Sequence, residues 1–237
     1  MNFKNQIIKL LKPSPISVRH AEYSMLYSAD DELTKPNERL FNLTFDASKA
    51  ALTANLDDIL KRTLPDVLLN VYPGEHYKLL AGMIQVLQPK LVIEIGTAKG
   101  LSALTMKKFL PDDGKIVTFD IINWNNYPGG TSLNNNDFDD GRLIQFTDDL
   151  SHSTSFSKHI ELLKEADFIF MDAAKDGSQE QRFIDNLKTI KFNNPPIVLF
   201  DDIRLWNMLK IWREITMPKL DITSFGHWSG TGIVDWR

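Results

Sequence analysis

Acidic side chains close three apolar segments of this 237-residue chain, where they could bind a ligand. Asp120, Asp172 and Asp201 each follow a run of apolar residues, and Asp202 comes directly after the last of them. One such Asp is often only a cap or turn residue. Parallel strands, however, end at one edge of a sheet, so these side chains are expected to line a common crevice. Carboxylates there can hold ribose hydroxyls or a divalent cation.

A glycine turn follows the most apolar segment, Leu91–Ile95, which predicts a strand buried on both faces. The turn Gly96-Thr-Ala-Lys-Gly100 leads into a segment with helical spacing. Glycines there let the backbone approach a ligand close to the start of a helix. Asp120 lies twenty residues beyond Gly100, where an acidic side chain can hold a ribose. The spacing lacks the middle glycine of a dinucleotide site, so it favours an adenosine ligand over a dinucleotide.

The elements that must position these residues alternate between strands and helices. Strands are predicted at 91–95, 115–120, 143–146, 167–172 and 196–202, and helices at 75–87, 101–110, 153–164, 178–190 and 205–215. This alternation predicts a parallel, doubly wound α/β sheet. Segments 220–225 and 232–236 predict a closing hairpin that adds one antiparallel strand at an edge. Ser178–Gln181 resembles a capping box, and Asn123–Asp140 predicts a long loop in place of a helix.

Residues 1–70 are predicted to form an N-terminal helical extension, and residues 71–237 the catalytic domain. Residues 1–12 indicate a short amphipathic helix, whereas 28–48 is polar, contains a proline and predicts a loop. Apolar residues then recur at helical spacing over 52–64. The extension is expected either to cap an active site or to form a subunit contact, so a homodimer is one expectation for the assembly.

Composition excludes several classes of protein. The net charge of −4 gives no electrostatic case for binding nucleic acid or a membrane surface. The absence of cysteine excludes disulfides, thiolate metal sites and a cysteine nucleophile. No apolar run is long enough to span a membrane, and a cytoplasmic protein is expected by default. The histidines show no metal-ligand spacing, His227 is expected to be structural, and the Trp206–Trp212 stripe is expected to be core.

Three motifs together resemble those of class I S-adenosylmethionine (SAM) dependent O-methyltransferases of the catechol and caffeoyl-CoA type. Glu94-Ile-Gly-Thr-Ala-Lys-Gly100-Leu-Ser-Ala is similar to the family's first motif, Glu-Ile-Gly-Thr-x-x-Gly-x-Ser-Ala. Phe168–Lys175 resembles its strand-four motif, in which an Asp is followed three residues later by a Lys. Ile197–Asp202 resembles its strand-five motif, which ends in Asp-Asn. The resemblance covers residues 74–237 and leaves 1–70 out.

The resemblance implies a Rossmann-like sheet of seven strands in the order 3-2-1-4-5-7-6, with strand seven antiparallel. It also implies two ligands, SAM and a divalent cation. The residues that it places around SAM are Glu94, Gly96, Thr97, Gly100, Ser102, Asp120 and Asp148, with Asp149 as the alternative to Asp148 near the adenine. The residues that it places at the cation are Asp172, Asp201 and Asp202, and it makes Lys175 the general base beside Asp172.

These residue types suit methyl transfer from a sulfonium, an in-line displacement by an oxygen held close to the methyl carbon. A hard cation such as Mg²⁺ takes carboxylate and hydroxyl oxygens as ligands and makes a bound hydroxyl more acidic. A lysine with a lowered pKa can accept the proton. Asp202 departs from the family's Asn. The extra charge either shifts the preference towards Mn²⁺ or Ca²⁺, or Asp202 turns away and caps the next helix.

The leading hypothesis is a metal-assisted, SAM-dependent O-methyltransferase that acts on a hydroxyl of a small acceptor with vicinal oxygens. A metal-independent SAM methyltransferase is the alternative within the same class. An NAD-dependent oxidoreductase is less favoured, because the middle glycine and a Tyr-x-x-x-Lys pair are both missing. A non-catalytic SAM-binding protein is also less favoured, because such a protein would need neither Asp172 nor Lys175.

Overall fold

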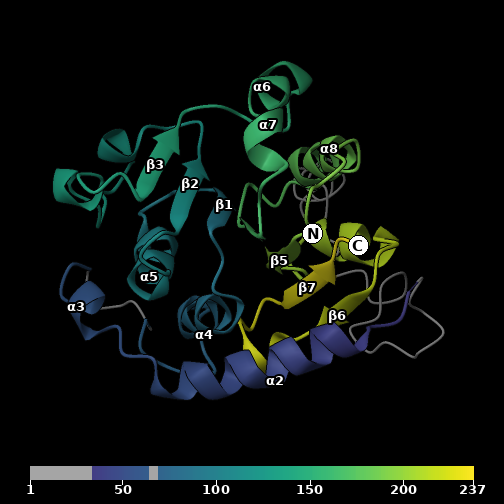
Figure 1. Cartoon of the computed structure of the whole chain (residues 1–237), viewed down its shortest axis with the longest axis horizontal. Coiled ribbons are helices and arrows are strands. Elements are labelled where there is room, and N and C mark those ends of the chain that lie inside the picture. The colour runs from purple at the N-terminus through teal and green to yellow at the C-terminus, as the bar shows by residue number, and fades with distance from the viewer. Residues whose placement is uncertain (1–33, 64–68) are drawn as a thin grey trace, which may run out of the picture.

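The computed structural model describes residues 34–63 and 69–237 (Figure 1). The described elements are α2 (Glu38–Thr53), α3 (Asp57–Leu60), α4 (Tyr77–Leu87), β1 (Leu91–Ile95), α5 (Leu101–Phe109), β2 (Lys115–Phe119), η2 (Trp124–Asn126), η3 (Asn135–Asp137), β3 (Leu143–Phe146), α6 (Ser153–Lys158), α7 (Ile160–Leu163), β4 (Phe168–Met171), α8 (Ser178–Leu187), β5 (Ile197–Asp201), α9 (Met208–Glu214), β6 (Lys219–Asp221), η4 (Thr223–Phe225) and β7 (Thr231–Asp235). The helix predicted over residues 1–12 lies outside the described residues.

Seven strands form one sheet in the order β3-β2-β1-β4-β5-β7-β6. The pairs among β1 to β5 are parallel, and β7 runs antiparallel to both β5 and β6. The predicted fold is therefore confirmed. The expectation of an antiparallel strand at the edge is wrong, because β7 lies inside the sheet and the three-residue β6 forms the edge. All five β7 residues are buried, whereas β6 is short and partly exposed, as suits an edge strand.

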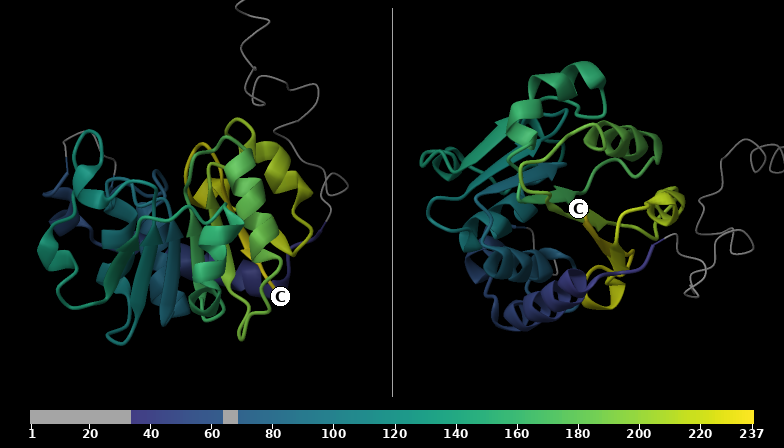
Figure 2. Two further views of the ribbon diagram at one scale, coloured as in Figure 1. Left: turned by 90° about the horizontal axis from the view of Figure 1, so that it is seen from above. Right: turned by 45° about the vertical axis from the view of Figure 1, so that its right-hand side comes forward.

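Helices cover both faces of the sheet and enclose two hydrophobic cores (Figures 1 and 2). Alternate residues of each strand face opposite sides. Val92 therefore packs with the residues of α2, α4 and α5, whereas Ile93 and Ile95 pack with those of α7, α8 and α9. Burial on both faces explains why these strands are nearly continuous apolar runs. It also leaves the carboxyl ends of the parallel strands as the edge where polar side chains gather.

Helix α2 occupies residues 38–48 of the loop predicted over residues 28–48 and contradicts that part of the prediction, whereas residues 28–33 lie outside the described residues. The Asn37 side chain accepts a hydrogen bond from the Leu40 backbone N–H at 3.0 Å and caps the helix, with Pro36 before the cap rather than inside the helix. Leu40, Leu43 and Ala47 then lie on one buried face. The prediction followed the polar residues and the proline, whereas the packing of this face against α4 decides the structure. The apolar residues over 52–64 do not form one helix either, because α2 ends at Thr53.

Asp235 is expected to stabilise the docking of α2 on the sheet. Its buried carboxylate accepts hydrogen bonds from Asn37 Nδ2 at 2.8 Å and Arg39 NH1 at 2.9 Å. Asp235→Asn should lower the free energy of unfolding by about 2 kcal/mol, because hydrogen bonds to charged groups contribute about 1.5–3 kcal/mol. Asp46→Asn, which removes only an exposed pair with Lys49, should change it by less than about 0.5 kcal/mol. Equal unfolding midpoints in denaturant for the two variants would contradict this role.

Smaller differences concern helix ends. The helix predicted over 153–164 is two short helices separated by His159. The predicted capping box is displaced by one residue: Gly177 is the N-cap of α8, and Glu180 Oε2 accepts the Gly177 N–H at 2.9 Å. Trp206 is 45% exposed, whereas Met208, Leu209, Ile211 and Trp212 of the predicted core stripe are buried. The predicted 123–140 loop is confirmed and contains the short 3-10 helices η2 and η3.

The longest described helix, α2, has 16 residues. None of the helices within 34–63 and 69–237 combines the length and the apolar character of a membrane span.

Candidate active site

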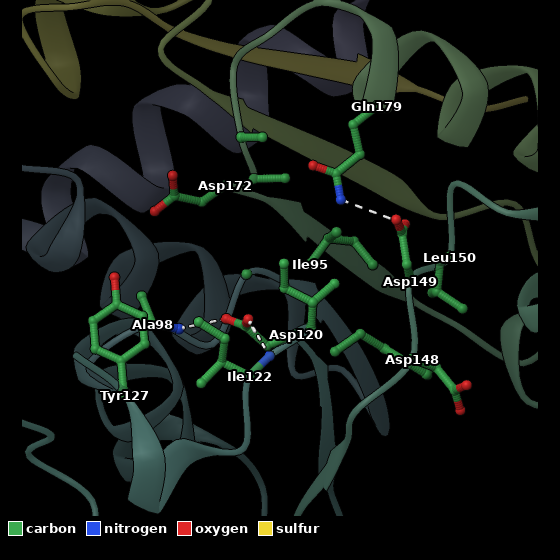
Figure 3. Close-up of a pocket in the computed structure, with 15 residues that line it drawn as sticks. Ile95, Ala98, Asp120, Ile122, Tyr127, Asp148, Asp149, Leu150, Asp172 and Gln179 are labelled. Atoms are coloured by element: carbon green, nitrogen blue, oxygen red, sulfur yellow. Dashed lines mark hydrogen bonds between the residues drawn. The ribbon is translucent and has the colours of Figure 1, made fainter.

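The predicted acidic residues lie at the carboxyl ends of the strands. Asp120 follows β2, Asp172 follows β4, Asp201 ends β5, and Asp202 comes next. Asp120 and Asp172 line one cavity of about 240 Å³, together with Gly96 of the glycine turn (Figure 3). Asp172 also lines a neighbouring cavity of about 170 Å³, bordered by the glycine turn and the start of α5. Asp172 therefore stands between the turn and the carboxylates of β5.

The two glycines of the turn are required by protein contacts. Gly96 has a φ of +102°, and a Cβ there would lie 1.9 Å from the backbone oxygen of Asp172. Gly100 has a φ of +79°, and a Cβ there would lie 2.3 Å from the side chain of Leu133. The sequence pattern predicts that these glycines let a ligand approach the backbone. The structure gives a different reason, because β4 and the 123–140 loop occupy the space beside the turn.

Asp120 holds the turn in place through backbone groups. Its Oδ2 accepts the Ala98 N–H at 2.9 Å, and its Oδ1 accepts the Ile122 N–H at 3.0 Å (Figure 3). A carboxylate has about four lone-pair sites, so both oxygens can still accept further hydrogen bonds. Thr97 is buried and its Oγ1 lies 2.7 Å from Thr118 Oγ1, a hydrogen bond that ties the turn to β2.

Asp148 and Asp149, which follow β3, point their carboxyl groups in different directions. Asp148 Oδ2 lies 2.9 Å from His159 Nε2, and the carboxyl group points away from Asp120 and Asp172 in Figure 3. The Asp149 carboxyl group instead meets Gln179 of α8, at 3.4 Å. Both residues line the larger cavity.

Glu94 is fully buried in β1, and neither of its carboxyl oxygens has a hydrogen-bond partner. Burial raises the pKa of Glu94 to about 7, although the neighbouring Ser102 and Thr118 hydroxyls act in the opposite direction. Ser102 is itself buried in the first turn of α5. A buried carboxyl group without a partner is unusual in a folded protein, and it fits a site for a cationic ligand group.

Lys175 connects two of the predicted metal ligands. Its Nζ contacts Asp172 Oδ1 and lies 2.9 Å from Asp202 Oδ2. Burial disfavours the charge of Lys175, but the two carboxylates outweigh this effect and raise its pKa. The expectation of a lowered pKa is therefore wrong for the arrangement in this structure. Lys175 and Asp202 have φ values of +58° and +59°, so two non-glycine residues with left-handed backbone lie at this edge of the sheet.

Two histidines lie beside the carboxylates, although the spacing of the histidines in the sequence predicts no metal site. His76 precedes α4 and is 5% exposed, with its Nδ1 3.1 Å from Asp201 Oδ2. His227, in the turn before β7, places Nδ1 3.5 Å from Asp201 Oδ1 and 3.3 Å from Asp202 Oδ1. Its Nε2 lies 3.0 Å from Glu75 Oε2. No sequence spacing signals this set, because its members come from four separate segments.

The donor set of this cluster fits a divalent cation. His76, Asp172 and Asp201 each offer a ligand atom within 4.8 Å of the others, and so do Asp201, Asp202 and His227. Asp201 is 3% exposed, yet its Oδ1 makes no hydrogen bond. Buried charges are generally paired or bound to a metal, and oxygen and imidazole ligands suit dications. Asp201 belongs to both groups, whereas Asp172 belongs to one and Asp202 to the other, so the predicted trio Asp172, Asp201 and Asp202 is not itself one of these groups.

Comparison with known proteins identifies relatives of one kind. Caffeoyl-CoA O-methyltransferase from Pinus taeda is 30% identical over 160 residues, which cover 61% of this chain and 59% of the relative. Caffeoyl-CoA O-methyltransferase 2 from Petunia hybrida is 31% identical over 124 residues, 48% of each protein. The matched regions thus span between 48% and 59% of the length of these relatives.

A solved structure from Staphylococcus aureus, provisionally assigned as a caffeoyl-CoA O-methyltransferase, shares the fold. It superimposes with a TM-score of 0.52 at 16% identity and covers 83% of this chain and 100% of that one. The model of the O-methyltransferase family matches residues 47–214. Since this match includes most of the chain and the motif-based resemblance points to the same relatives, the protein belongs to the O-methyltransferase family.

Proposed function

We propose that this protein transfers the methyl group of SAM to a hydroxyl of a small acceptor with vicinal oxygens, assisted by a divalent cation. The observation that carries the proposal is the place of Asp172. It lines both cavities beside the glycine turn and also belongs to the cluster of candidate cation ligands. A methyl donor at the turn and an acceptor at the cluster would therefore meet at this residue, as an in-line displacement requires.

The residues proposed to hold SAM surround the glycine turn. Asp120 would accept hydrogen bonds from the ribose hydroxyls, because it faces the cavity and has spare lone pairs. Glu94 would accept the ammonium of the methionine part, which would give its buried oxygens a partner. Gly96, Thr97, Gly100 and Ser102 would form the wall of that subsite. Asp149 is favoured over Asp148 as the contact to the adenine, because the Asp148 carboxyl group points away from Asp120 and Asp172 (Figure 3).

Asp172, Asp201 and Asp202 are proposed to hold the cation, with Mg²⁺ or Mn²⁺ as candidates. The cation would orient the two acceptor oxygens and lower the pKa of the reacting hydroxyl. Lys175 is proposed to take the proton of that hydroxyl as the methyl group moves to oxygen. This step needs the neutral amine of Lys175, which a cation bound by Asp172 and Asp202 would favour by compensating the charge of these carboxylates. Asp172 and Asp202 hold the Lys175 ammonium at the place where the acceptor would bind.

A metal-independent methyltransferase is the second candidate. It is favoured by the same ion pairs, because Lys175 already compensates part of the negative charge of the cluster.

We also propose that residues 1–70 form an N-terminal helical extension beside a catalytic domain of residues 71–237. The described part of this extension contains α2 and α3, and α2 packs on α4 of the catalytic domain.

The proposal is tested by calorimetry with SAM and its demethylated product, followed by transfer of labelled methyl from SAM to a panel of vicinal diols. Binding of both nucleosides and transfer to a diol are expected. Excess EDTA should stop the transfer without releasing SAM. Full transfer in EDTA would contradict the role of the cation and favour the metal-independent candidate. Absence of SAM binding would contradict the proposal as a whole.

Asp120→Ala should weaken SAM binding roughly ten- to hundredfold. The variant loses a charge-assisted hydrogen bond of about 1.5–3 kcal/mol, and about 1.4 kcal/mol corresponds to one decade of affinity. Asp139→Ala is the control, because it removes an acidic side chain of the 123–140 loop that lines none of the described cavities near the turn. Calorimetric dissociation constants check both variants. An unchanged constant in Asp120→Ala would place the ribose contact elsewhere.

A further inference from the structure

We propose that His76 and His227 are ligands of the cation, so that the site selects a first-row transition-metal dication over Mg²⁺. The inference rests on the proposed function, since it specifies the cation of the same site. The imidazoles of His76 and His227 lie beside Asp201 together with the neighbouring carboxylates.

His76 is buried as a ligand would be. It is 5% exposed, and neither ring nitrogen makes a hydrogen bond. The ring is held by Tyr77 and Phe170, whose centroids lie 4.4 and 5.2 Å from that of His76. A buried polar side chain without a hydrogen bond is rare. Here Nδ1 of His76 lies 3.1 Å from Asp201 Oδ2, within a group of candidate cation ligands.

The separations between nitrogen and oxygen match those of atoms that share one metal ion. Two ligands at about 2.1 Å from a metal lie roughly 3.0–3.5 Å apart for bond angles near 90–110°. His76 Nδ1 lies 3.1 Å from Asp201 Oδ2, and His227 Nδ1 lies 3.5 Å from Asp201 Oδ1. Both pairs lie within ion-pair distance, but His76 Nδ1 and Asp201 Oδ1 make no hydrogen bond.

Glu75 supplies the outer partner that a ligating histidine normally has. Its Oε2 lies 3.0 Å from His227 Nε2, on the side of the ring opposite to the nitrogen that faces Asp201 and Asp202. Metal-bound histidines usually donate their second N–H to a carboxylate, which fixes the tautomer and the ring direction. Glu75 is half-buried and therefore suited to keep Nδ1 of His227 directed at the cluster, where this nitrogen also lies 2.7 Å from Ser229 Oγ.

The resulting site contains two imidazoles and one shared carboxylate, His76, His227 and Asp201. Asp201 offers a ligand atom within 4.8 Å of those of His76 and Asp172 and also within 4.8 Å of those of Asp202 and His227, so it is the carboxylate that these two groups share. Imidazole ligands suit Fe²⁺, Co²⁺, Ni²⁺ and Zn²⁺, whereas Mg²⁺ prefers oxygen ligands and water. Asp172 borders both cavities and would complete the site on the side where the acceptor is proposed to bind.

The test uses the full chain after removal of metals by chelation, with Co²⁺ and Mg²⁺ as probes. Co²⁺ is followed by visible absorption and calorimetry, and Mg²⁺ by calorimetry. Wild-type protein should bind Co²⁺ at least about tenfold more tightly than Mg²⁺. His76→Gln and His227→Gln should each weaken Co²⁺ binding roughly ten- to hundredfold and change Mg²⁺ binding by less than about threefold.

His159→Gln is the matched control, because this histidine is also largely buried and pairs with Asp148 outside the cluster. It should leave Co²⁺ affinity unchanged. Equal affinities of wild-type protein for Co²⁺ and Mg²⁺, or unchanged Co²⁺ affinity in both cluster variants, would overturn the inference. If the buried His76→Gln variant does not fold, electron paramagnetic resonance of bound Cu²⁺ in wild-type protein decides. Splitting from two nitrogens supports the inference, and its absence overturns it.

SAM binding, measured separately by calorimetry, distinguishes this inference from the proposed function. Tight SAM binding with no preference for Co²⁺ overturns only the histidine ligands. A Co²⁺ site that depends on both histidines, without SAM binding, supports the ligands and contradicts the methyltransferase proposal.

Discussion

Asp172→Asn is expected to lower the rate of methyl transfer at least about 100-fold, since even outer partners of metal ligands contribute 10- to 100-fold. The amide removes one negative charge from the cluster and one carboxylate from the contact with Lys175. SAM affinity should change less than about tenfold, because the proposed contacts of Glu94 and Asp120 remain. Initial rates with a diol acceptor and calorimetry with SAM check the two expectations.

Asp202→Asn is the matched control, since it makes the same chemical change beside the same lysine. It restores the Asn of the family's strand-five motif, and Asn accepts the φ of +59° found at this position. Ser229 can still donate its hydroxyl to the amide oxygen. The rate of this variant should stay within about tenfold of wild type. Equal losses in the two variants would show that Asp172 has no special place in the reaction.

Gly96→Ala is expected to damage both the fold and the SAM site. Its Cβ would lie 1.9 Å from the backbone oxygen of Asp172, and the φ of +102° is unfavourable for any other residue. Strain and overpacking should together cost about 3 kcal/mol of unfolding free energy or more. The ends of β1 and β4 would have to separate, which moves Asp172 and weakens both SAM and cation binding. Thermal unfolding and calorimetry measure these effects.

Gly129→Ala provides the control for backbone strain alone. Gly129 has a φ of +83°, but a Cβ there meets no atom within 4 Å. This variant should lose only about 1–2 kcal/mol, the cost of placing a side chain in the left-handed region. The difference between the two alanine variants isolates the contact between the turn and β4. Wild-type stability and SAM affinity in Gly96→Ala would refute this account of the glycine.

The strands and the family motifs could be predicted from the sequence because local patterns encode them. Strands buried on both faces must be apolar throughout, so the runs ending at Ile95, Met171 and Phe200 were recognisable without their neighbours. Parallel strands also place their carboxyl ends together, which brought Asp172 and Asp201 to one edge as expected. Helix α2 was missed, because its polar residues are local whereas its buried face is defined only by α4.

The side chains around Asp201 are brought there by long-range packing. His76 and His227 are separated by 151 positions along the chain, and each reaches the carboxylate from a turn whose own sequence predicts no ligand. Local spacing reveals metal ligands only where they lie on the same helix or loop. The antiparallel insertion of β7 beside β5 carries His227 to this edge, and the packing of α4 on the sheet carries His76 there. Local sequence patterns therefore suffice to predict the acidic residues at this edge, whereas the histidine nitrogens beside them depend on long-range packing.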